Sequence, residues 1–504
     1  MVWRGRACGC IQFSKSWLSR RLSKTFKIFK TFCKIFLPLL LAFGMRTHLL
    51  NSLKGADLPD NTLFLSRTLE EFVWQEMNNE IDGPYNLEPL RELCRMRNYQ
   101  PGLIVSCEAP AGGVGNVRNI ILNCIRFALE GGATGFVVPE IMIRSASWLS
   151  AIHTSDNADF AYMFDPTHFL DSFSAACPRV RIYQNINELP STLTTNVSEP
   201  ILCSASGLSK QFNPISSTLI DKPKYWREQF DIWLNKNVPP FAHAYPALII
   251  FSNSDLFVSF PMICDSSEFV ASFGKLLKFR EDLRRLAATV LYALSSTYQM
   301  HLTFRPFEIQ QQKFLGAHLR TDSDAEEVSW PNYDFQSLNI LNSAITQNLP
   351  IIYLASGSPS ESQKFISQAF THGLNVTTKD ILLGSSLGSS SPYHSAVKEL
   401  EALTWDQRGI VDYLVLLRSS YFVGMYESSF SWNVVNRRRV VVGNGSWMEI
   451  NEGNRGGGGR IESLREGMEE CFWDERSAIF GPVGMETSPP GKGNRWHYPL
   501  GLWP

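Results

Sequence analysis

The chain has 504 residues, which is too long for one small hydrophobic core, so we expect two domains. Its formal charge is −1, yet eleven basic residues precede the first acidic residue, Asp57, and the rest holds 36 basic against 48 acidic residues. A mildly acidic body argues against nucleic acid as a partner.

The basic N-terminal segment leads into an apolar run from Ile35 to Met45. That run is short for a bilayer, which takes about 20 residues, but the apolar residues from Phe26 onward lengthen it if the interspersed lysines reach to the surface. Positive charge before the run keeps the N-terminus cytosolic and sends the body into the lumen. We expect a cytosolic tail at 1–25, a signal anchor at 26–45 and a stem at 46–61. A cleaved signal peptide and a mitochondrial presequence are the alternatives.

This topology predicts a single-pass type II protein of the Golgi or endoplasmic reticulum membrane, with its body in the lumen. Beyond the anchor, the cysteines are Cys94, Cys107, Cys124, Cys177, Cys203, Cys264 and Cys471. In an oxidising lumen some of them pair, and their odd number leaves at least one unpaired. Their spacing does not match a metal site.

The first half predicts a βαβ unit. An uninterrupted apolar run at 103–107 indicates a buried strand, and a glycine-rich turn follows it. A helix at 119–130 then has apolar residues at helical spacing and ends at two glycines, and a strand at 134–139 completes the unit.

The glycine turn is a candidate anion site. Gly112, Gly113 and Gly115 let backbone N–H groups approach a ligand, and the following helix N-terminus carries partial positive charge. Asn116 and Arg118 directly after it can both donate to an anion. The motif is neither a dinucleotide fingerprint nor a Walker A motif, and a tight turn without a ligand is the alternative.

Further along, we expect an amphipathic helix at 222–235, a strand at 247–251 and one long helix at 269–294 with a solvated basic face. The domain boundary is placed near residue 300, which gives an N-terminal domain at 62–300 and a C-terminal domain at 301–504.

The second half opens with an apolar strand at 313–319 that ends in four polar residues spaced two apart, His318, Arg320, Asp322 and Asp324. On an extended chain they share one side, at the carboxyl edge where α/β sheets bind ligands. The fork of donors on Arg320 matches phosphate oxygens. A surface salt bridge, or the metal-binding DxD of a GT-A glycosyltransferase at 322–324, would also account for the pattern.

Strands and helices then alternate, which predicts a doubly wound parallel sheet. The expected elements are helices at 335–347, 361–370 and 407–418, strands at 351–355 and 421–424, a helix opened by Ser428 and closed by 437–439, and a strand at 440–442. Ser428, Ser429, Phe430 and Ser431 occupy a strand-to-helix turn, where hydroxyls and free N–H groups make an N-cap and an anion cradle. Simple capping is the alternative.

Three blocks of this sequence resemble the GDP-fucose O-fucosyltransferases, and they lie in the order and spacing of that family across roughly residues 103 to 443. They are Gly112-Gly-Val-Gly-Asn-Val-Arg118, His318-Leu-Arg-Thr-Asp-Ser-Asp324, and the block from Asp412-Tyr413 through Phe422-Val-Gly424 to Ser428-Ser-Phe-Ser431 and Arg437. The chain is similar to a fungal branch of the family.

The resemblance implies an α/β protein of the GT-B type, with two Rossmann-like domains facing a central cleft. It implies inverting transfer of fucose from GDP-fucose to a hydroxyl of a protein or glycan acceptor, without a metal ion or other cofactor. Arg320 would neutralise the β-phosphate, with Ser428, Ser429 and the Phe430 N–H in support. His318 would contact the nucleotide, Asp324 would hold the nucleoside or an arginine, and Asn116 would face the fucose and the acceptor hydroxyl. The resemblance also assigns Gly112, Gly113, Gly115, Arg118 and Asp322 to substrate binding.

One departure concerns the general base. Some members of the family have a glutamate within the glycine block, where this chain has Gly113, and Glu108 lies before the block, out of register. The base is Glu108, Asp322, a group on the acceptor, or absent. A non-catalytic relative that binds a GDP-sugar or a glycan, and a GT-B transferase with another nucleotide sugar, are the competing functions.

Overall fold

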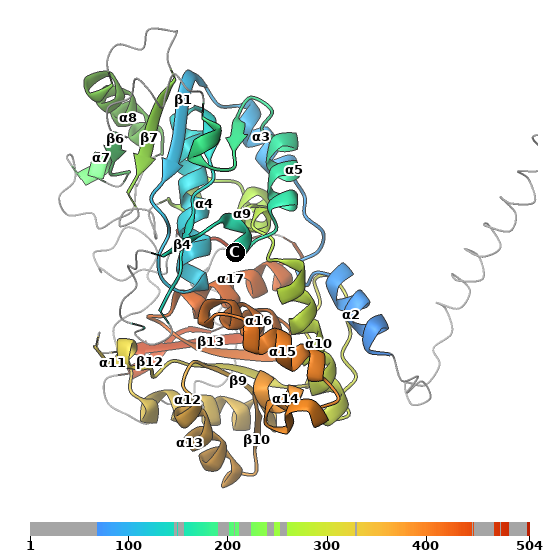
Figure 1. Ribbon diagram of the computed structural model, residues 1–504. Helices are drawn as coiled ribbons and strands as arrows, with labels where there is room; N and C mark the ends of the chain where they lie inside the picture. Colours follow the sequence, from blue (N-terminus) through green and yellow to red (C-terminus); the bar gives the residue numbers. More distant parts are fainter. Residues whose placement is uncertain are drawn as a thin grey trace, which may run out of the picture. The chain divides into compact units, whose positions relative to one another are not determined.

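Two β-sheets, one from each half of the sequence, organise the part of the protein that can be described (Figure 1). The structure is a computed structural model, and it describes residues 68–145, 149, 156–189, 201–205, 207–210, 223–238, 246–252, 260–327, 330–445, 447, 468–473, 475–482 and 501–504. The anchor and stem predicted at 26–61 lie outside these residues. Within the described residues, no helix is both long and apolar enough to cross a bilayer.

The first sheet is parallel throughout, as the βαβ pattern predicts. Its strands, in spatial order, are β5 (Arg181–Tyr183), β2 (Ala133–Val137), β1 (Gln100–Cys107), β7 (Ala247–Phe251) and β6 (Ile201–Cys203). The chain order reverses between β1 and β7, so the switch point of this sheet lies at the end of β1.

The second sheet is parallel except at one edge, where β12 runs antiparallel to β13. Its strands, in spatial order, are β10 (Asn375–Thr377), β9 (Ile351–Ser356), β8 (Leu315–Leu319), β11 (Tyr421–Met425), β13 (Ser477–Pro482) and β12 (Met468–Trp473). The switch point lies between β8 and β11, and ligands bind at this position in open α/β sheets.

Helices cover both sheets. Those of the first half are α2 (Leu69–Asn78), α3 (Glu88–Arg95), α4 (Val114–Gly131), α5 (Pro166–Ala176), α7 (Gly207–Lys210), α8 (Pro223–Asn237), α9 (Ser267–Phe273) and α10 (Glu281–Thr297). Those of the second half are α11 (Ser323–Glu327), α12 (Tyr333–Thr346), α13 (Pro359–Phe370), α14 (Lys379–Leu383), α15 (His394–Ala402), α16 (Trp405–Leu417) and α17 (Ser429–Val442). The α/β architecture expected from the sequence is confirmed.

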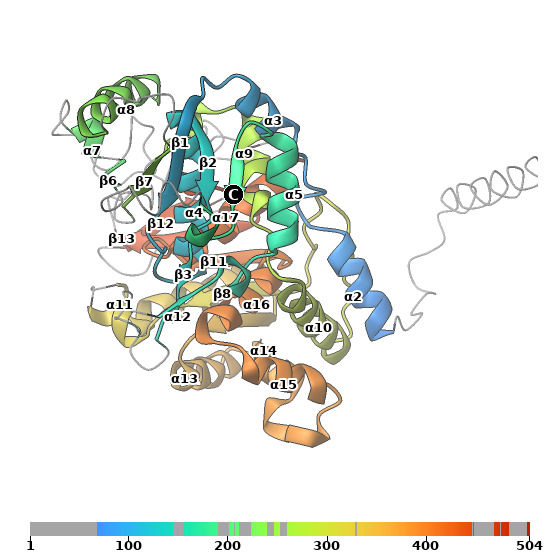
Figure 2. The same ribbon diagram turned by 45° about the horizontal axis from the view of Figure 1, so that its top comes forward.

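Helices α4 and α17 lie between the two sheets, and the turned view shows them side by side again (Figures 1 and 2). Each is the first helix after the carboxyl end of a strand, α4 after β1 and α17 after β11. The described C-terminal residues 501–504 join them: the indole of Trp503 donates to Asn123 of α4 at 2.9 Å, and Asn436 of α17 donates to the Leu502 carbonyl at 2.6 Å.

The single helix predicted at 269–294 is wrong. The chain leaves the helical path after a 3-10 turn at Gly274–Leu276 and forms α10 only from Glu281. In between, the backbone pairs with the segment before α5: the Lys278 carbonyl accepts from Asp165 at 2.8 Å, and Arg280 donates to the Met163 carbonyl at 3.1 Å. A long-range backbone pairing therefore overrides the local helical periodicity.

The strand predicted at 440–442 is also wrong, because α17 continues to Val442. The three arginines before it do not close the helix. Arg438 is fully buried, and its guanidinium donates to the carbonyls of Leu417 and Ser419 at 3.0 and 2.8 Å. These hydrogen bonds of Arg438 keep residues 440–442 helical, although valine favours strands. Strands β12 and β13 had no recognised sequence signal.

Two disulfides, Cys94–Cys177 and Cys107–Cys124, tie elements of the first half together. The first joins the helices α3 and α5, and the second joins the end of β1 to α4, the helix that follows it. The expectation that some cysteines pair is therefore met.

One residue of the basic face expected to be solvated, Lys275, belongs instead to a buried ion cluster, whereas Lys278, Arg280, Arg284 and Arg285 are half-buried or exposed. Lys275 is 7% exposed and Asp82 is 4% exposed. Arg437 of α17 binds Asp82 at 2.8 Å, and Lys275 donates to the Asp82 carbonyl at 2.9 Å. Burial alone would raise the pKa of Asp82, but the charges of Arg437 and Lys275 outweigh it and hold that pKa below its usual value.

Replacing Asp82 with alanine leaves two buried cations without their shared counter-ion. We expect Asp82→Ala to lower the free energy of unfolding by about 3–5 kcal/mol, measured by urea titration. The matched control is Asp282→Ala, whose pair with Arg280 is about one-third exposed and should cost at most about 1 kcal/mol. Equal losses for the two variants would contradict the assigned role of the buried cluster.

Candidate active site

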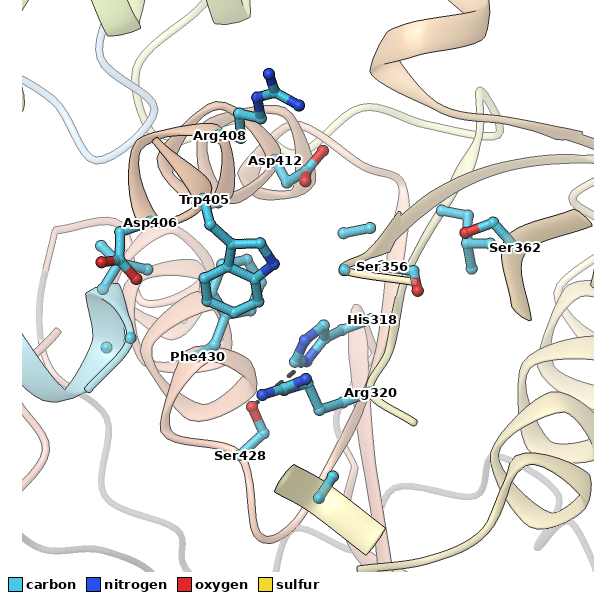
Figure 3. Close-up of a pocket in the computed structure, with 18 of the residues that line it drawn as sticks. His318, Arg320, Ser356, Ser362, Trp405, Asp406, Arg408, Asp412, Ser428 and Phe430 are labelled. Carbon is cyan, nitrogen blue, oxygen red and sulfur yellow. Dashed lines mark hydrogen bonds between the residues drawn. The ribbon is translucent and has the colours of Figure 1, made fainter. Parts of the chain in front are cut away.

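A cavity of about 890 Å³ opens where the carboxyl ends of both sheets meet. The glycine turn after β1 forms one wall, and the ends of β8, β9, β10 and β11 form the other. Figure 3 shows residues of the second wall, with Trp405 of α16 directed toward Arg320 and His318. A cavity of this size accommodates a ligand as large as a nucleotide sugar.

Arg320 follows the last residue of β8 and is 7% exposed. Its guanidinium is bound by Asp322 and by Asp324, and a second arginine, Arg144, binds the same oxygen of Asp324. The chain turns into α11 at residue 323, so the extended backbone expected there ends early. The carboxylates nevertheless meet Arg320, because the short helix brings residue 324 back toward residue 320.

The ring of Trp405 packs against the guanidinium groups of both Arg320 and Arg144. Its ring centroid lies 5.4 Å from Cζ of Arg320 and 5.0 Å from Cζ of Arg144, which is the range of cation–π contacts. Arg320 thus has a fixed position before any ligand arrives. Among the described residues, no group of three or more His, Cys, Asp or Glu side chains is arranged to bind a metal ion. Metal independence stays a prediction.

The N-terminus of α17 faces the same cavity. The Ser428 hydroxyl caps it by accepting the Ser431 N–H at 3.3 Å, and Ser429 and Phe430 follow in the first turn, where backbone N–H groups lack partners within the helix. His318 of β8 lies against this turn, with Nδ1 at 2.9 Å from the Ser431 hydroxyl and its ring at 4.6 Å from that of Phe430.

His318 is neutral at physiological pH. Burial, together with the positive charge of Arg320, lowers the pKa of His318 to about 3. A histidine with that pKa does not serve as a proton shuttle near pH 7, and the contacts of its ring are with the first turn of α17.

The glycine turn contacts α17 directly. Gly112 has φ +100°, a backbone conformation that favours glycine, and the Ser429 hydroxyl donates to Oδ1 of Asn116. A β-carbon on Gly115 would lie 2.7 Å from the carbonyl carbon of Ser429 and 2.8 Å from the nitrogen of Phe430. Only glycine permits this approach, which brings two helix N-termini to one cavity.

Asp412 lies deeper, on α16. It accepts a hydrogen bond from the Tyr353 hydroxyl at 2.7 Å and forms an ion pair with Lys379 at 2.7 Å. Burial raises the pKa of Asp412, and the charge of Lys379 opposes that shift. The block that the sequence marked at 412–413 therefore stabilises the cavity wall between β9 and the start of α14.

Most of the predicted site residues line this cavity. They are Gly112, Gly113, Gly115, Asn116, His318, Arg320, Asp324, Ser428, Ser429 and Phe430. Three others do not: Glu108, Arg118 and Asp322. Asp322 lies behind Arg320, to which it is bound, and burial raises the pKa of Asp322 against the effect of that arginine.

Arg118 and Glu108 face other neighbours. Arg118 is two residues after Asn116 on α4, about 200° around the helix, and its guanidinium binds the carbonyls of Trp503 and Pro504. Burial lowers its pKa to about 10. Glu108 accepts a hydrogen bond from the Ser252 hydroxyl at 3.2 Å, across the switch point of the first sheet. The structure does not bring these two side chains to the cavity, contrary to the sequence prediction.

Several cavity residues were missed, among them Trp405, Asp406 and Arg144. Trp405 and Asp406 lie in the first turn of α16. The capping box formed by Thr404 and Gln407 indicates this helix start in the sequence, but the helix was predicted to begin only at 407. Arg144 follows the short strand β3 (Ile141–Met142), and no local pattern marks it. It reaches the cavity only through tertiary contacts.

The family model described as GDP-fucose protein O-fucosyltransferase matches residues 103–441 of this chain. The match covers both walls of the cavity and every cavity-lining residue named above. A search of curated proteins gave no match.

Solved structures of fucosyltransferases are similar over most of the chain. POFUT1 in complex with GDP-fucose is 14% identical with a TM-score of 0.41, over 76% of this chain and 99% of its own. Arabidopsis thaliana FUT1 is 11% identical with a TM-score of 0.32, over 73% and 76%. NodZ from Bradyrhizobium is 14% identical with a TM-score of 0.32, over 67% and 92%. The family match, rather than these similarities, identifies the chain.

The contact at Gly115 gives a sharp prediction. We expect Gly115→Ala to lower the free energy of unfolding by about 1–3 kcal/mol and to weaken ligand binding, because its methyl group meets the backbone of α17. Gly113→Ala is the control, since its β-carbon would find only Arg144 Nη1 at 3.7 Å. Thermal unfolding compares the two variants, and an equally stable Gly115→Ala protein would contradict the close approach.

Proposed function

The chain belongs to the GDP-fucose protein O-fucosyltransferase family and is a glycosyltransferase, and we propose that it moves fucose from GDP-fucose to a hydroxyl of a protein or glycan acceptor. We propose further that transfer inverts the anomeric carbon and needs no metal ion. The observation that carries the proposal is the buried Arg320, fixed at the wall of the cavity beside the N-terminus of α17.

Departure of GDP builds negative charge on the β-phosphate, and the donors around Arg320 suit that charge. The guanidinium fork can bind two phosphate oxygens, while the N–H groups of Ser429 and Phe430 lie at the positive end of a helix. Donors fixed before the reaction need no reorganisation during it, which is why such groups contribute strongly to catalysis. In the absence of a metal, Arg320 would provide the neutralising charge.

The carboxylates on Arg320 set a condition for donor binding. Two arginines and two aspartates make the cluster neutral, so a diphosphate has to displace a carboxylate from Arg320. Asp324 is suited to yield, because its Oδ2 already binds Arg144 and its Oδ1 has no hydrogen-bond partner among the described residues. Asp324 would thus hold an arginine rather than the nucleoside.

Asn116 would act as a donor and not as a base. Ser429 donates to its amide oxygen, so the amide nitrogen is the group it can present to the sugar or to the acceptor hydroxyl. The nucleoside would occupy the other end of the cavity, along the carboxyl ends of β9 and β10, where Ser356 and Thr378 line the wall.

We propose a luminal body, held in the Golgi or endoplasmic reticulum membrane by the anchor at 26–45. The two disulfides support an oxidising compartment, since such bonds are rare in reducing ones.

The role of Arg320 is tested with a conservative change. Arg320→Lys keeps the positive charge and its balance with Asp322 and Asp324 but loses the fork, so we expect GDP release from GDP-fucose to fall by about 10²–10³-fold. The exposed Arg285→Ala, which loses only a surface pair with Glu399, should match the wild type. Circular dichroism checks the fold, and full turnover in Arg320→Lys would contradict the proposal.

The donor is tested by thermal shift with GDP-fucose, GDP, UDP-glucose and ADP. A ligand at 100 times its Kd adds about 2.7 kcal/mol, so GDP and GDP-fucose should raise the melting temperature by several degrees and the other two should not. EDTA should leave that shift unchanged. A shift for UDP-glucose alone would point to another nucleotide-sugar transferase, and one that requires manganese would contradict metal independence.

A further inference from the structure

Asp406 is a buried carboxylate at the cavity wall with an unused oxygen. The residue is 1% exposed, and it stands in the first turn of α16 directly after Trp405. Its Oδ2 accepts the backbone N–H of Arg144 at 3.2 Å, while its Oδ1 has no hydrogen-bond partner among the described residues. A buried carboxylate oxygen left without a donor is costly, and such cases call for a functional explanation.

The surroundings of Asp406 come from both halves of the chain. Arg144 approaches from the first half, and its guanidinium pairs with Asp324. Burial raises the pKa of the Tyr162 phenol, in the 3-10 turn Phe160–Tyr162, and the negative charge of Asp406 adds to that shift. On α16 itself, Arg408 also lines the cavity. Asp406 therefore stands where the two halves of the chain meet.

Figure 3 draws Asp406 and Ser362 at opposite sides of the pocket, with His318, Arg320 and Ser428 between them. If the nucleoside lies at the Ser362 end and the diphosphate at Arg320, the sugar extends toward Asp406. A base for inverting transfer has to stand on the side of the anomeric carbon away from the leaving phosphate. In that arrangement Asp406 would meet the requirement.

We propose that Asp406 is the general base that activates the acceptor hydroxyl; this assignment rests on the proposed function. The proton of the acceptor O–H moves to Oδ1 of Asp406 as the acceptor oxygen bonds to the anomeric carbon of fucose. The bond from that carbon to the phosphate oxygen breaks, and its electron pair leaves with GDP. Asp406 afterwards returns the proton to water. Because Oδ1 is covered in the free protein, part of the cavity wall has to turn aside before an acceptor reaches it.

Glu327 and Asp380 also line the cavity but are exposed to solvent. The remaining carboxylates near the cavity form other pairs or lie on the wrong side. Asp322 and Asp324 bind Arg320, and Asp412 binds Lys379 and Tyr353. Glu427 also has a buried oxygen without a partner among the described residues, but it precedes Ser428, on the side of the leaving phosphate.

The acidity of Asp406 fits this role. Burial raises the pKa of Asp406 to about 7, against the opposing effects of the Arg144 N–H and its positive charge. A base works best when its pKa lies near the working pH. The carboxylate form is the active one, so the rate should fall as the pH drops through 7.

The test uses the full chain and water as the acceptor. In Asp406→Asn, we expect GDP release from GDP-fucose to fall by roughly 10²–10⁴-fold. Affinity for GDP, measured by calorimetry, should stay within about threefold, which corresponds to a change in binding free energy of less than about 1 kcal/mol. Azide needs no deprotonation, so azide should restore GDP release in the variant and yield fucosyl azide of inverted configuration. Glu427→Gln tests the rival carboxylate, and Glu399→Gln, at a partly exposed residue outside the cavity, is the control that should hydrolyse the donor like the wild type.

The outcomes distinguish failure of the proposed function from failure of Asp406 as the general base. A wild-type protein that does not bind GDP-fucose overturns the proposed function itself. Tight binding of GDP-fucose together with unchanged hydrolysis in Asp406→Asn overturns only the assignment of the base. A loss that azide does not rescue, or that comes with a lower melting temperature and weaker GDP binding, would assign Asp406 a structural role. A loss in Glu427→Gln with none in Asp406→Asn would transfer the role to Glu427.

Discussion

The site depends on how Arg320 is held. A guanidinium with 7% exposure is stable only where its charge is balanced, and here Asp322 and Asp324 balance it while Trp405 covers it. Arg144 shares Asp324, so the balance links a strand end of the second sheet to a loop of the first half. The same contacts that position the cation for a diphosphate also connect the two walls of the cavity.

A second constraint brings the helices together. Gly115 permits the backbone of α17 to approach α4, and Asn116 is hydrogen-bonded to Ser429 across that contact. The C-terminal residues reinforce it, because Arg118 binds their carbonyls. Two helix N-termini thus face one cavity without depending on flexible loops, and a preorganised cradle of this kind favours binding of a leaving group whose charge grows.

The sequence predicted residues at or just after the carboxyl ends of strands, because parallel strands in α/β proteins bring those ends to one edge. His318, Arg320 and Ser428 were found in this way. It missed Arg144 and Asp406, whose importance comes from contacts between segments distant in sequence. It misplaced Arg118, because this residue lies two positions after Asn116 on α4 and its side chain therefore points away from the cavity. The break before α10 and the length of α17 likewise follow from long-range bonds that no local periodicity contains.

A crystal structure of the full chain with GDP tests the central claim most directly. We expect both terminal nitrogens of Arg320 within about 2.7–2.9 Å of β-phosphate oxygens, as in bidentate arginine–phosphate pairs, with Asp324 bound only to Arg144. The N–H groups of Ser429 and Phe430 should face the same phosphate. A diphosphate bound elsewhere, with Arg320 still closed on Asp322 and Asp324, would contradict it.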